Sequence, residues 1–136
     1  MLDADQTEAM MEYHTLKFCR HKHIASLLEA FVENKILSLV FDPVEGDEII
    51  RALAYKNKYT EFTISRIVSQ VLNALQFLHC YGIVHLDLEP SNVVTVSRRR
   101  FDIKLVDFSC AKNVLSEEGE ELANESNGTL EFMGES

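Results

Sequence analysis

The sequence has little of what marks secreted, membrane-spanning or nucleic-acid-binding proteins. Its 3 cysteines form no CxxC pair, which favours reduced intracellular thiols over a disulfide framework. No apolar run approaches the roughly 20 residues of a membrane-spanning helix, and we expect no signal peptide from the first residues. Lys and Arg total 13 against 22 Asp and Glu, a net charge of -9, which argues against a nucleic-acid or anionic-membrane partner. These features predict a cytoplasmic protein.

What the sequence does contain is enough apolar material for a core, because 46% of its 136 residues are hydrophobic. That length and share are typical of one globular domain. Residues 5–19 have few Gly, Pro or β-branched residues and predict a helix. Residues 63–81 carry a wide apolar stripe that ends at Gly82 and predict a long, buried helix. A shorter helix is expected over 46–54.

Short, β-branched apolar runs between the helices predict two antiparallel hairpins. The first pair of runs is 25–31 and 36–41, joined by 32–35 with an Asn-Lys turn, and the second pair is 93–96 and 103–106, joined by 97–100. Residues 110–125 are polar and carry five glutamates, so this segment predicts a mobile loop.

Two groups of polar residues are candidates for a metal site, and only the first has suitable ligands. Asp87 and Asn92 stand in the loop before the second hairpin, and Asp107 stands where that hairpin ends. Carboxylate and amide oxygens suit a hard cation such as Mg²⁺, although Asp and Asn are also simply common in loops and turns. The cluster of residues 21–23, His-Lys-His, lacks Cys or acidic partners at ligand spacing. A turn after the first helix is therefore the favoured interpretation there.

The spacing around these residues resembles the catalytic core of eukaryotic protein kinases. The stretch 85–92 reads His-Leu-Asp-Leu-Glu-Pro-Ser-Asn and 107–109 reads Asp-Phe-Ser, against H-R-D-L-x-x-x-N and D-F-G in that family. Leu86 stands at the position of the family's Arg. In this respect the chain resembles the myosin-light-chain-kinase, titin and obscurin branch of serine/threonine kinases. The resemblance covers residues 12–136.

This resemblance implies an α+β, protein-kinase-like fold that is only partly present. Residues 1–42 would be the back half of the small lobe, with the regulatory helix and two strands. Residues 43–46 would be the hinge, and 47–136 the front half of the helical large lobe through the activation segment.

The resemblance also implies a role for each candidate site residue. Asp87 would be the catalytic base, and Asn92 and Asp107 would hold Mg²⁺ beside the phosphates of ATP. The residues that would bind or support the nucleotide are the gatekeeper Phe41, Asp42 and Val44 in the hinge, Val94 below the adenine, and Glu12 on the regulatory helix. An apolar column through both lobes would consist of Leu16, Leu27, His85 and Phe108. Read without the resemblance, Glu12 is a solvated helix charge and the apolar members are ordinary core residues.

Several positions depart from the kinase pattern. Glu89 puts an anion where the family has the Lys that contacts the transferred phosphate. At about 4 Å and an effective dielectric near 20, two unit charges interact by about 4 kcal/mol, so this exchange is expected to slow transfer strongly. Ser109 replaces the metal-loop Gly and loses its tolerance for positive φ. Residues 134–136 replace the closing A-P-E, and no Gly-rich loop or V-A-I-K lysine precedes Glu12.

Two functions remain open at this point. The chain would be part of a serine/threonine protein kinase domain that transfers phosphate from ATP to protein hydroxyls, with the isolated chain inactive. Alternatively, it would come from a pseudokinase that binds scaffold partners within a large cytoskeletal protein. The expected partners are a nucleotide, a protein substrate or scaffold, and the rest of the parent kinase domain.

Overall fold

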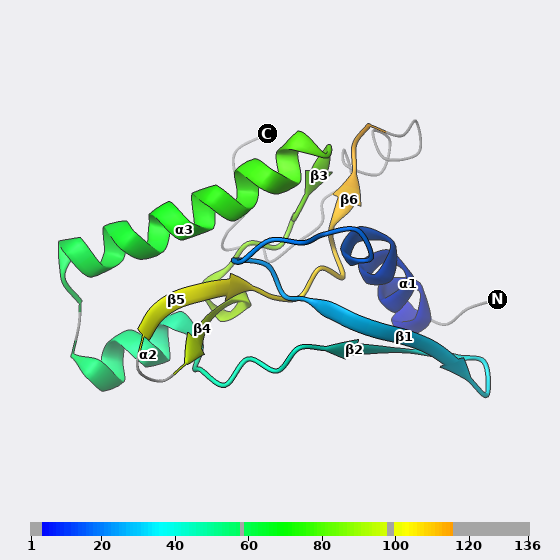
Figure 1. Cartoon of the computed structure of the whole chain (residues 1–136), viewed down its shortest axis with the longest axis horizontal. Helices are drawn as coiled ribbons and strands as arrows, with labels where there is room; N and C mark the ends of the chain where they lie inside the picture. Colours follow the sequence, from blue (N-terminus) through cyan, green and yellow to red (C-terminus); the bar gives the residue numbers. More distant parts are fainter. Residues whose placement is uncertain (1–3, 58, 98–99, 116–136) are drawn as a thin grey trace.

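A computed structural model describes residues 4–57, 59–97 and 100–115 of the chain (Figure 1). The elements follow in the order α1 (Ala4–Leu16), β1 (Leu27–Glu33), β2 (Ile36–Phe41), α2 (Ile49–Lys56), α3 (Glu61–Cys80), β3 (Ile83–Val84), the 3₁₀ turn η1 (Pro90–Asn92), β4 (Val93–Ser97), β5 (Arg100–Leu105) and β6 (Lys112–Asn113). The described strands form three two-stranded antiparallel sheets, β1-β2, β3-β6 and β4-β5. None of the described helices has both the length and the apolar character that crossing a membrane requires.

The β1-β2 hairpin forms where the Asn-Lys turn predicted it. Asn34 and Lys35 both have positive φ, at 50° and 67°, which is the conformation of a two-residue type I′ turn. Helix α1 packs against both strands, and the backbone amide of Leu37 donates to Oε1 of Gln6 in α1 at 2.7 Å. The hairpin extends away from the other two sheets at the lower right of Figure 1.

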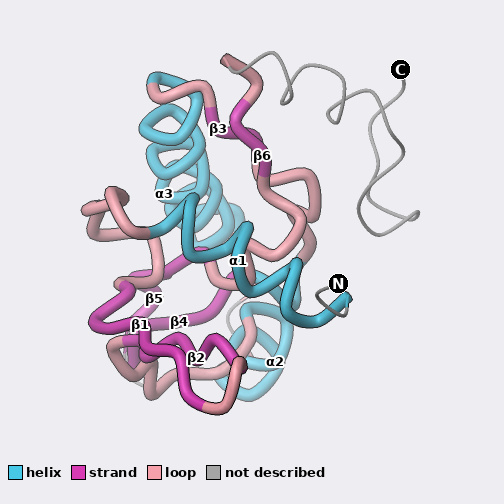
Figure 2. Tube along the Cα trace, turned by 90° about the vertical axis from the view of Figure 1, so that its right-hand side faces the viewer, coloured by secondary structure: helices cyan, strands magenta, loops and turns pink. Residues whose placement is uncertain are grey.

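The long helix α3 forms as predicted, but it is buried on one side only. Thr60 caps its first turn, because its Oγ1 accepts from the amide of Thr63 at 3.2 Å. Ile67, Ala74 and Leu78 are buried, whereas other members of the predicted stripe are exposed, namely Ile64, Val68 and Leu72. The helix predicted to be buried is therefore buried on one face only. The stripe is wider than the face that packs on β5 and β3. Figure 2 shows α3 alongside β3.

The two halves of the described chain are joined by backbone pairing along β5. The amide of Ala25 donates to the Leu105 carbonyl at 2.9 Å, and the Leu105 amide donates to the His23 carbonyl at 2.8 Å. The segment that leads from α1 into β1 therefore runs along β5. The same pairing gives His23 a structural role in place of metal binding. His23 is buried, and its Nδ1 lies 2.9 Å from the Ile103 carbonyl.

A second junction ties the segment after β2 to strand β4. Oγ1 of Thr95 accepts from the Asp47 amide at 3.0 Å and lies 3.1 Å from the Asp47 carbonyl, to which its hydroxyl donates. The Thr95 amide donates to the same carbonyl at 2.9 Å. A Cβ on Gly46 would meet the Thr95 carbonyl oxygen at 1.9 Å, so this close approach requires glycine.

One predicted loop contains a strand. Residues 110–125 were expected to be a mobile loop, but Lys112–Asn113 pair with Ile83–Val84 as β6 and β3. The sequence of β6 is too short and too polar to signal a strand, and only the partner segment stabilises it. The remainder of this predicted loop, residues 116–125, lies outside the described residues.

Candidate active site

The loop from His85 to Asn92 is closed on itself by the Asn92 side chain. Nδ2 of Asn92 donates to the Asp87 carbonyl at 2.9 Å and lies 3.5 Å from Asp87 Oδ2. Asn92 is buried and ends η1, while its backbone carbonyl accepts from the Val106 amide at 3.0 Å. Because Nδ2 is engaged with Asp87 and no described residue donates to Oδ1, the amide oxygen of Asn92 is the atom left to accept a ligand.

Asp107 follows this junction with its carboxylate exposed. Its φ is 58°, a left-handed conformation that is uncommon for residues other than Gly but that Asp adopts more readily than most. Oδ1 of Asp107 accepts from the Ser109 amide at 3.2 Å and from the Ser109 hydroxyl at 2.6 Å. Ser109 itself has no positive φ. The expected loss of backbone freedom at Ser109 therefore costs nothing, and its hydroxyl adds a bond that glycine cannot make.

The rings of His85 and Phe108 pack together and connect the loop 85–92 to the loop 107–109. Their ring centroids are 4.7 Å apart, and both residues are buried. The amide of Asp87 donates to Nδ1 of His85 at 3.3 Å, which assigns the ring proton of the neutral form to Nε2. Burial lowers the pKa of His85, against the smaller opposing effects of the Val106 backbone, Asp107 and Asp87. A neutral imidazole therefore supports the backbone on which Asp87 stands.

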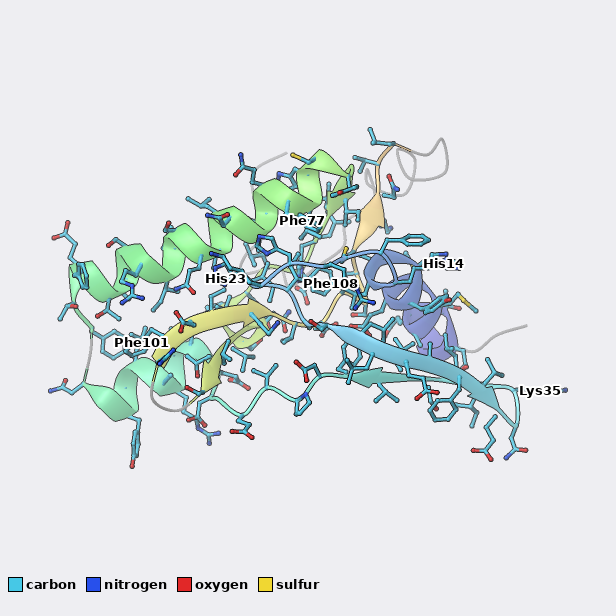
Figure 3. The ribbon with its side chains drawn as sticks, in the orientation of Figure 1. His14, His23, Lys35, Phe77, Phe101 and Phe108 are labelled. Atoms are coloured by element: carbon cyan, nitrogen blue, oxygen red, sulfur yellow. The ribbon has the colours of Figure 1, made fainter. Side chains whose placement is uncertain are left out.

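The predicted apolar column is buried along its whole length. Leu16 is 1% exposed, Leu27 6%, His85 2% and Phe108 0%. Leu16, Leu27 and Phe108 belong to one core cluster, which also contains Leu105. Figure 3 shows Phe108 in the interior of the molecule, between α1 and the strands.

Glu12 reaches the same loop from α1. Its Oε1 accepts from the Phe108 amide at 3.1 Å, across 96 positions of the sequence. Burial raises the pKa of Glu12, the Phe108 hydrogen bond lowers it, and the nearby Asp107 carboxylate raises it further. Glu12 is thus a specific contact of the Asp107–Phe108 loop, and the alternative of a solvated helix charge does not describe it.

The four residues assigned to the adenine pocket lie on two segments. Phe41 ends β2 and packs half-buried against the core. The amide of Asp42 donates to the Ser26 carbonyl at 2.9 Å, and Val44 is half-buried after it. Val94 lies in β4 opposite Lys104 and forms an isolated backbone bridge with Glu48. The chain after Val44 therefore meets β4, but no hydrogen bond among the described residues joins Phe41 or Val44 to β4.

The side chain of Glu89 is hydrogen-bonded to a neighbour in the same loop. The Ser91 hydroxyl donates to Oε1 of Glu89, and Glu89 is partly exposed. This bond occupies one carboxylate oxygen without neutralising the charge. The anion at the position of the family lysine thus remains an anion.

The described residues offer Mg²⁺ a small number of oxygen ligands. They do not form a dedicated metal site made of several protein side chains. Among the residues that the structure describes, no three His, Cys, Asp or Glu side chains gather closely enough to hold a metal ion. Mg²⁺ keeps several waters and needs one or two carboxylates besides the phosphates of its substrate. The exposed carboxylate of Asp107 and the open amide oxygen of Asn92 meet that requirement.

Sequence reasoning missed the polar contacts that hold this site in place. Thr95 is 1% exposed and bonds to Asp47, and Ser109 bonds to Asp107. Thr95 gave no signal because a Thr in a strand is ordinary. Gly46 offered only the general signal of a turn or loop.

Fold and site together define a protein-kinase-like molecule, in which the loops 85–92 and 107–109 are joined by the buried pair of His85 and Phe108. The model of the protein kinase domain family matches residues 2–135 of the chain. The chain therefore belongs to the protein kinase domain family.

Individual proteins that are similar in sequence or structure support this assignment. The chain is 36% identical over 108 residues to the muscle M-line assembly protein unc-89 of Caenorhabditis elegans, covering 79% of this chain and 1% of that protein. It is 30% identical over 122 residues to a probable myosin light chain kinase of Dictyostelium discoideum, covering 88% and 31%. The autoinhibited serine kinase domain of titin superimposes with a TM-score of 0.73 and 32% identity, over 83% of this chain and 36% of that one. The chain thus spans about a third or less of each of these proteins.

Proposed function

We propose that the chain is the segment of a serine/threonine protein kinase domain that carries the hinge, the catalytic loop and the metal loop. Its support is one observation, the contact between Asn92 and Asp87 beside the exposed Asp107. In this proposal residues 1–42 contribute to the small lobe, 43–46 form the hinge, and 47–136 contribute to the large lobe.

The chemistry assigned to these residues is phosphoryl transfer from ATP to a protein hydroxyl. Asp87 accepts or orients the proton of the substrate hydroxyl, and the Asn92 amide keeps the Asp87 backbone and carboxylate in one position. Mg²⁺, when bound, neutralises charge on the phosphates. Asn92 Oδ1 and the Asp107 carboxylate would hold it, and the Ser109 hydroxyl fixes the rotamer of Asp107.

The nucleotide-binding residues complete the proposal. Phe41, Asp42 and Val44 line the adenine along the hinge, and Val94 lies below it. Glu12 positions the Asp107–Phe108 loop through its bond to the Phe108 amide. The free cysteines and the resemblance to an M-line protein support a cytoplasmic, cytoskeletal location for a parent protein that acts on a protein substrate or a scaffold partner.

Glu89 sets a specific expectation for nucleotide choice. A carboxylate near the γ-phosphate repels ATP more than ADP, since ADP lacks that phosphate. Glu89 should therefore disfavour Mg·ADP less than Mg·ATP, and transfer by the 136-residue chain alone should be undetectable.

The test is isothermal titration of both nucleotides with Mg²⁺ into the chain and its variants. Glu89→Lys should raise the affinity for Mg·ATP by at least about 10-fold, which is ~1.4 kcal/mol, and change Mg·ADP affinity less. Glu33→Lys makes the same charge change at the exposed end of β1 and should alter neither. Asp107→Asn should remove the Mg²⁺ dependence. Equal gains in Glu89→Lys and Glu33→Lys, or a Mg²⁺ dependence that survives Asp107→Asn, would contradict the proposal.

A further inference from the structure

A basic groove lies between α3, β5 and the segment that precedes β1. It consists of two adjoining cavities of about 430 and about 280 Å³ that share Arg66 and Asp102. Arg100 lines the larger cavity, and Lys22 lines the smaller. None of the proposed catalytic or nucleotide-binding residues lines either cavity, so the groove is separate from the candidate active site.

The charge of this basic groove is opposite to that of the whole chain. The chain carries a net charge of -9, yet the described lining has the cations Lys22, Arg66 and Arg100 against one carboxylate, Asp102. Lys22 and Arg100 are exposed, and neither forms an ion pair with another described residue. Three cations in one hollow repel one another unless an anion shares them.

The one ion pair in the groove is weak. Nη2 of Arg66 lies 3.9 Å from Oδ1 of Asp102, and the two side chains are 57% and 46% exposed. Exposed pairs at such a distance contribute little to stability. Arg66 therefore remains available to a carboxylate from outside, and Asp102 competes with that carboxylate.

Hydrogen bonds join the α3 wall of the groove to the β5 wall. Phe62, Arg66 and Gln70 are four residues apart in α3 and so lie on one face of the helix. The side-chain amide of Gln70 donates to the Phe101 carbonyl at 2.8 Å and accepts from the Ile103 amide at 3.0 Å, which ties this face of α3 to β5. Figure 3 shows Phe101 near one end of β5 and His23 towards the other, both beside α3.

Apolar side chains adjoin the cations at one end. Phe62 is 72% exposed one turn before Arg66, and Phe101 lines the cavity that contains Arg100. A ligand that fits this arrangement carries several carboxylates along an extended backbone, with an apolar side chain among them.

We propose that the basic groove is a docking surface for a short acidic peptide segment of a partner protein. Three cations spaced along two cavities match the carboxylates of an extended peptide better than a single small anion. A nucleic acid is disfavoured, because the surrounding charge of the acidic chain repels a long polyanion. Docking here leaves the nucleotide site open, so the two kinds of ligand bind independently.

The test is fluorescence anisotropy with the 136-residue chain and a fluorescein-labelled peptide in which Glu and Leu alternate. Binding is expected, with a loss of at least about 10-fold in affinity in Arg66→Glu and in Lys22→Glu. Arg51→Glu makes the same charge change on the exposed face of α2, outside both cavities, and should bind as the unchanged chain does. Asp102→Asn removes the competing carboxylate and should tighten binding several-fold. Far-UV circular dichroism checks that each variant is folded.

Other results would overturn the proposal. Equal losses in Arg66→Glu and Arg51→Glu would mean that net charge alone attracts the peptide. Tighter binding of a single-stranded oligonucleotide than of the peptide would assign the groove to nucleic acid. Peptide binding that appears only after the glutamates of 117–125 are changed to Gln would assign it to the chain's own acidic segment. Weakening of the peptide by Mg·ATP would show that the groove is not independent of the nucleotide site.

Discussion

The two longer hairpins have the same topology and very different surroundings. In the outer hairpin, β1-β2, Leu27 alone is buried among the side chains of the two strands, and Val32 and Ile36 are 68% and 56% exposed. In the inner hairpin, β4-β5, the paired residues Thr95 and Ile103 are 1% and 0% exposed. A turn and alternating apolar residues are enough to pair two strands, but only packing fixes where a hairpin stands. The candidate site is built on the inner hairpin, whose residues Val93, Ile103 and Leu105 belong to the core.

The largest expected difference between the two hairpins is in the cost of removing one phenylalanine ring associated with each. Phe108→Ala removes a fully buried ring beside the inner hairpin and should lower the free energy of unfolding by about 3–5 kcal/mol. Phe31→Ala removes a ring in the outer hairpin that is 44% exposed and should cost about 1 kcal/mol. Urea unfolding followed by circular dichroism measures both, and equal costs would refute the contrast.

A smaller effect is expected from the hydrogen bonds of the inner hairpin. Thr95→Val keeps the shape of the side chain but leaves the Asp47 amide without its Oγ1 acceptor, at a cost of about 1–3 kcal/mol. Ser38→Ala in the outer hairpin should change stability by no more than about 0.5 kcal/mol. The same urea series tests the pair. A cost for Thr95→Val no larger than that for Ser38→Ala would show that Thr95 does not anchor the segment after β2.

The smallest effect concerns Glu12, which connects α1 beside the outer hairpin to the loop after the inner one. Burial raises the pKa of Glu12 above its ordinary value of 4.5, so the folded state holds the proton more tightly than the unfolded chain. The stability that this proton contributes is present below pH 4.5 and is lost as the pH rises through the higher pKa of the folded state. Glu12→Gln should remove this loss while keeping an oxygen that accepts from the Phe108 amide.

Urea midpoints on both sides of this pH window measure the effect. The difference between the acidic and the neutral midpoint should shrink in Glu12→Gln. Glu8→Gln, in the same helix but without a contact to Phe108, should leave that difference as it is. An unchanged pH profile in Glu12→Gln would mean that the Glu12 carboxylate is solvated.

The sequence by itself predicted the local elements and the family. Local sequence patterns located the three described α-helices and both longer hairpins to within a few residues, since helix and strand patterns repeat over short distances. The spacing of Asp87, Asn92 and Asp107 identified the kinase resemblance, because that spacing follows from one loop and one hairpin that are contiguous in the chain.

Only the tertiary structure decided which of these groups meet. Glu12 and Phe108 are 96 positions apart, Asp47 and Thr95 are 48 apart, and β6 exists only because β3 lies beside it. Such contacts depend on how separate elements pack, and no local pattern encodes them. The exposed half of the α3 stripe and the basic groove of Lys22, Arg66 and Arg100 likewise depend on which faces the neighbouring elements cover. A sequence pattern identifies an apolar or basic residue, but the fold decides whether that residue lies in the core or at the surface.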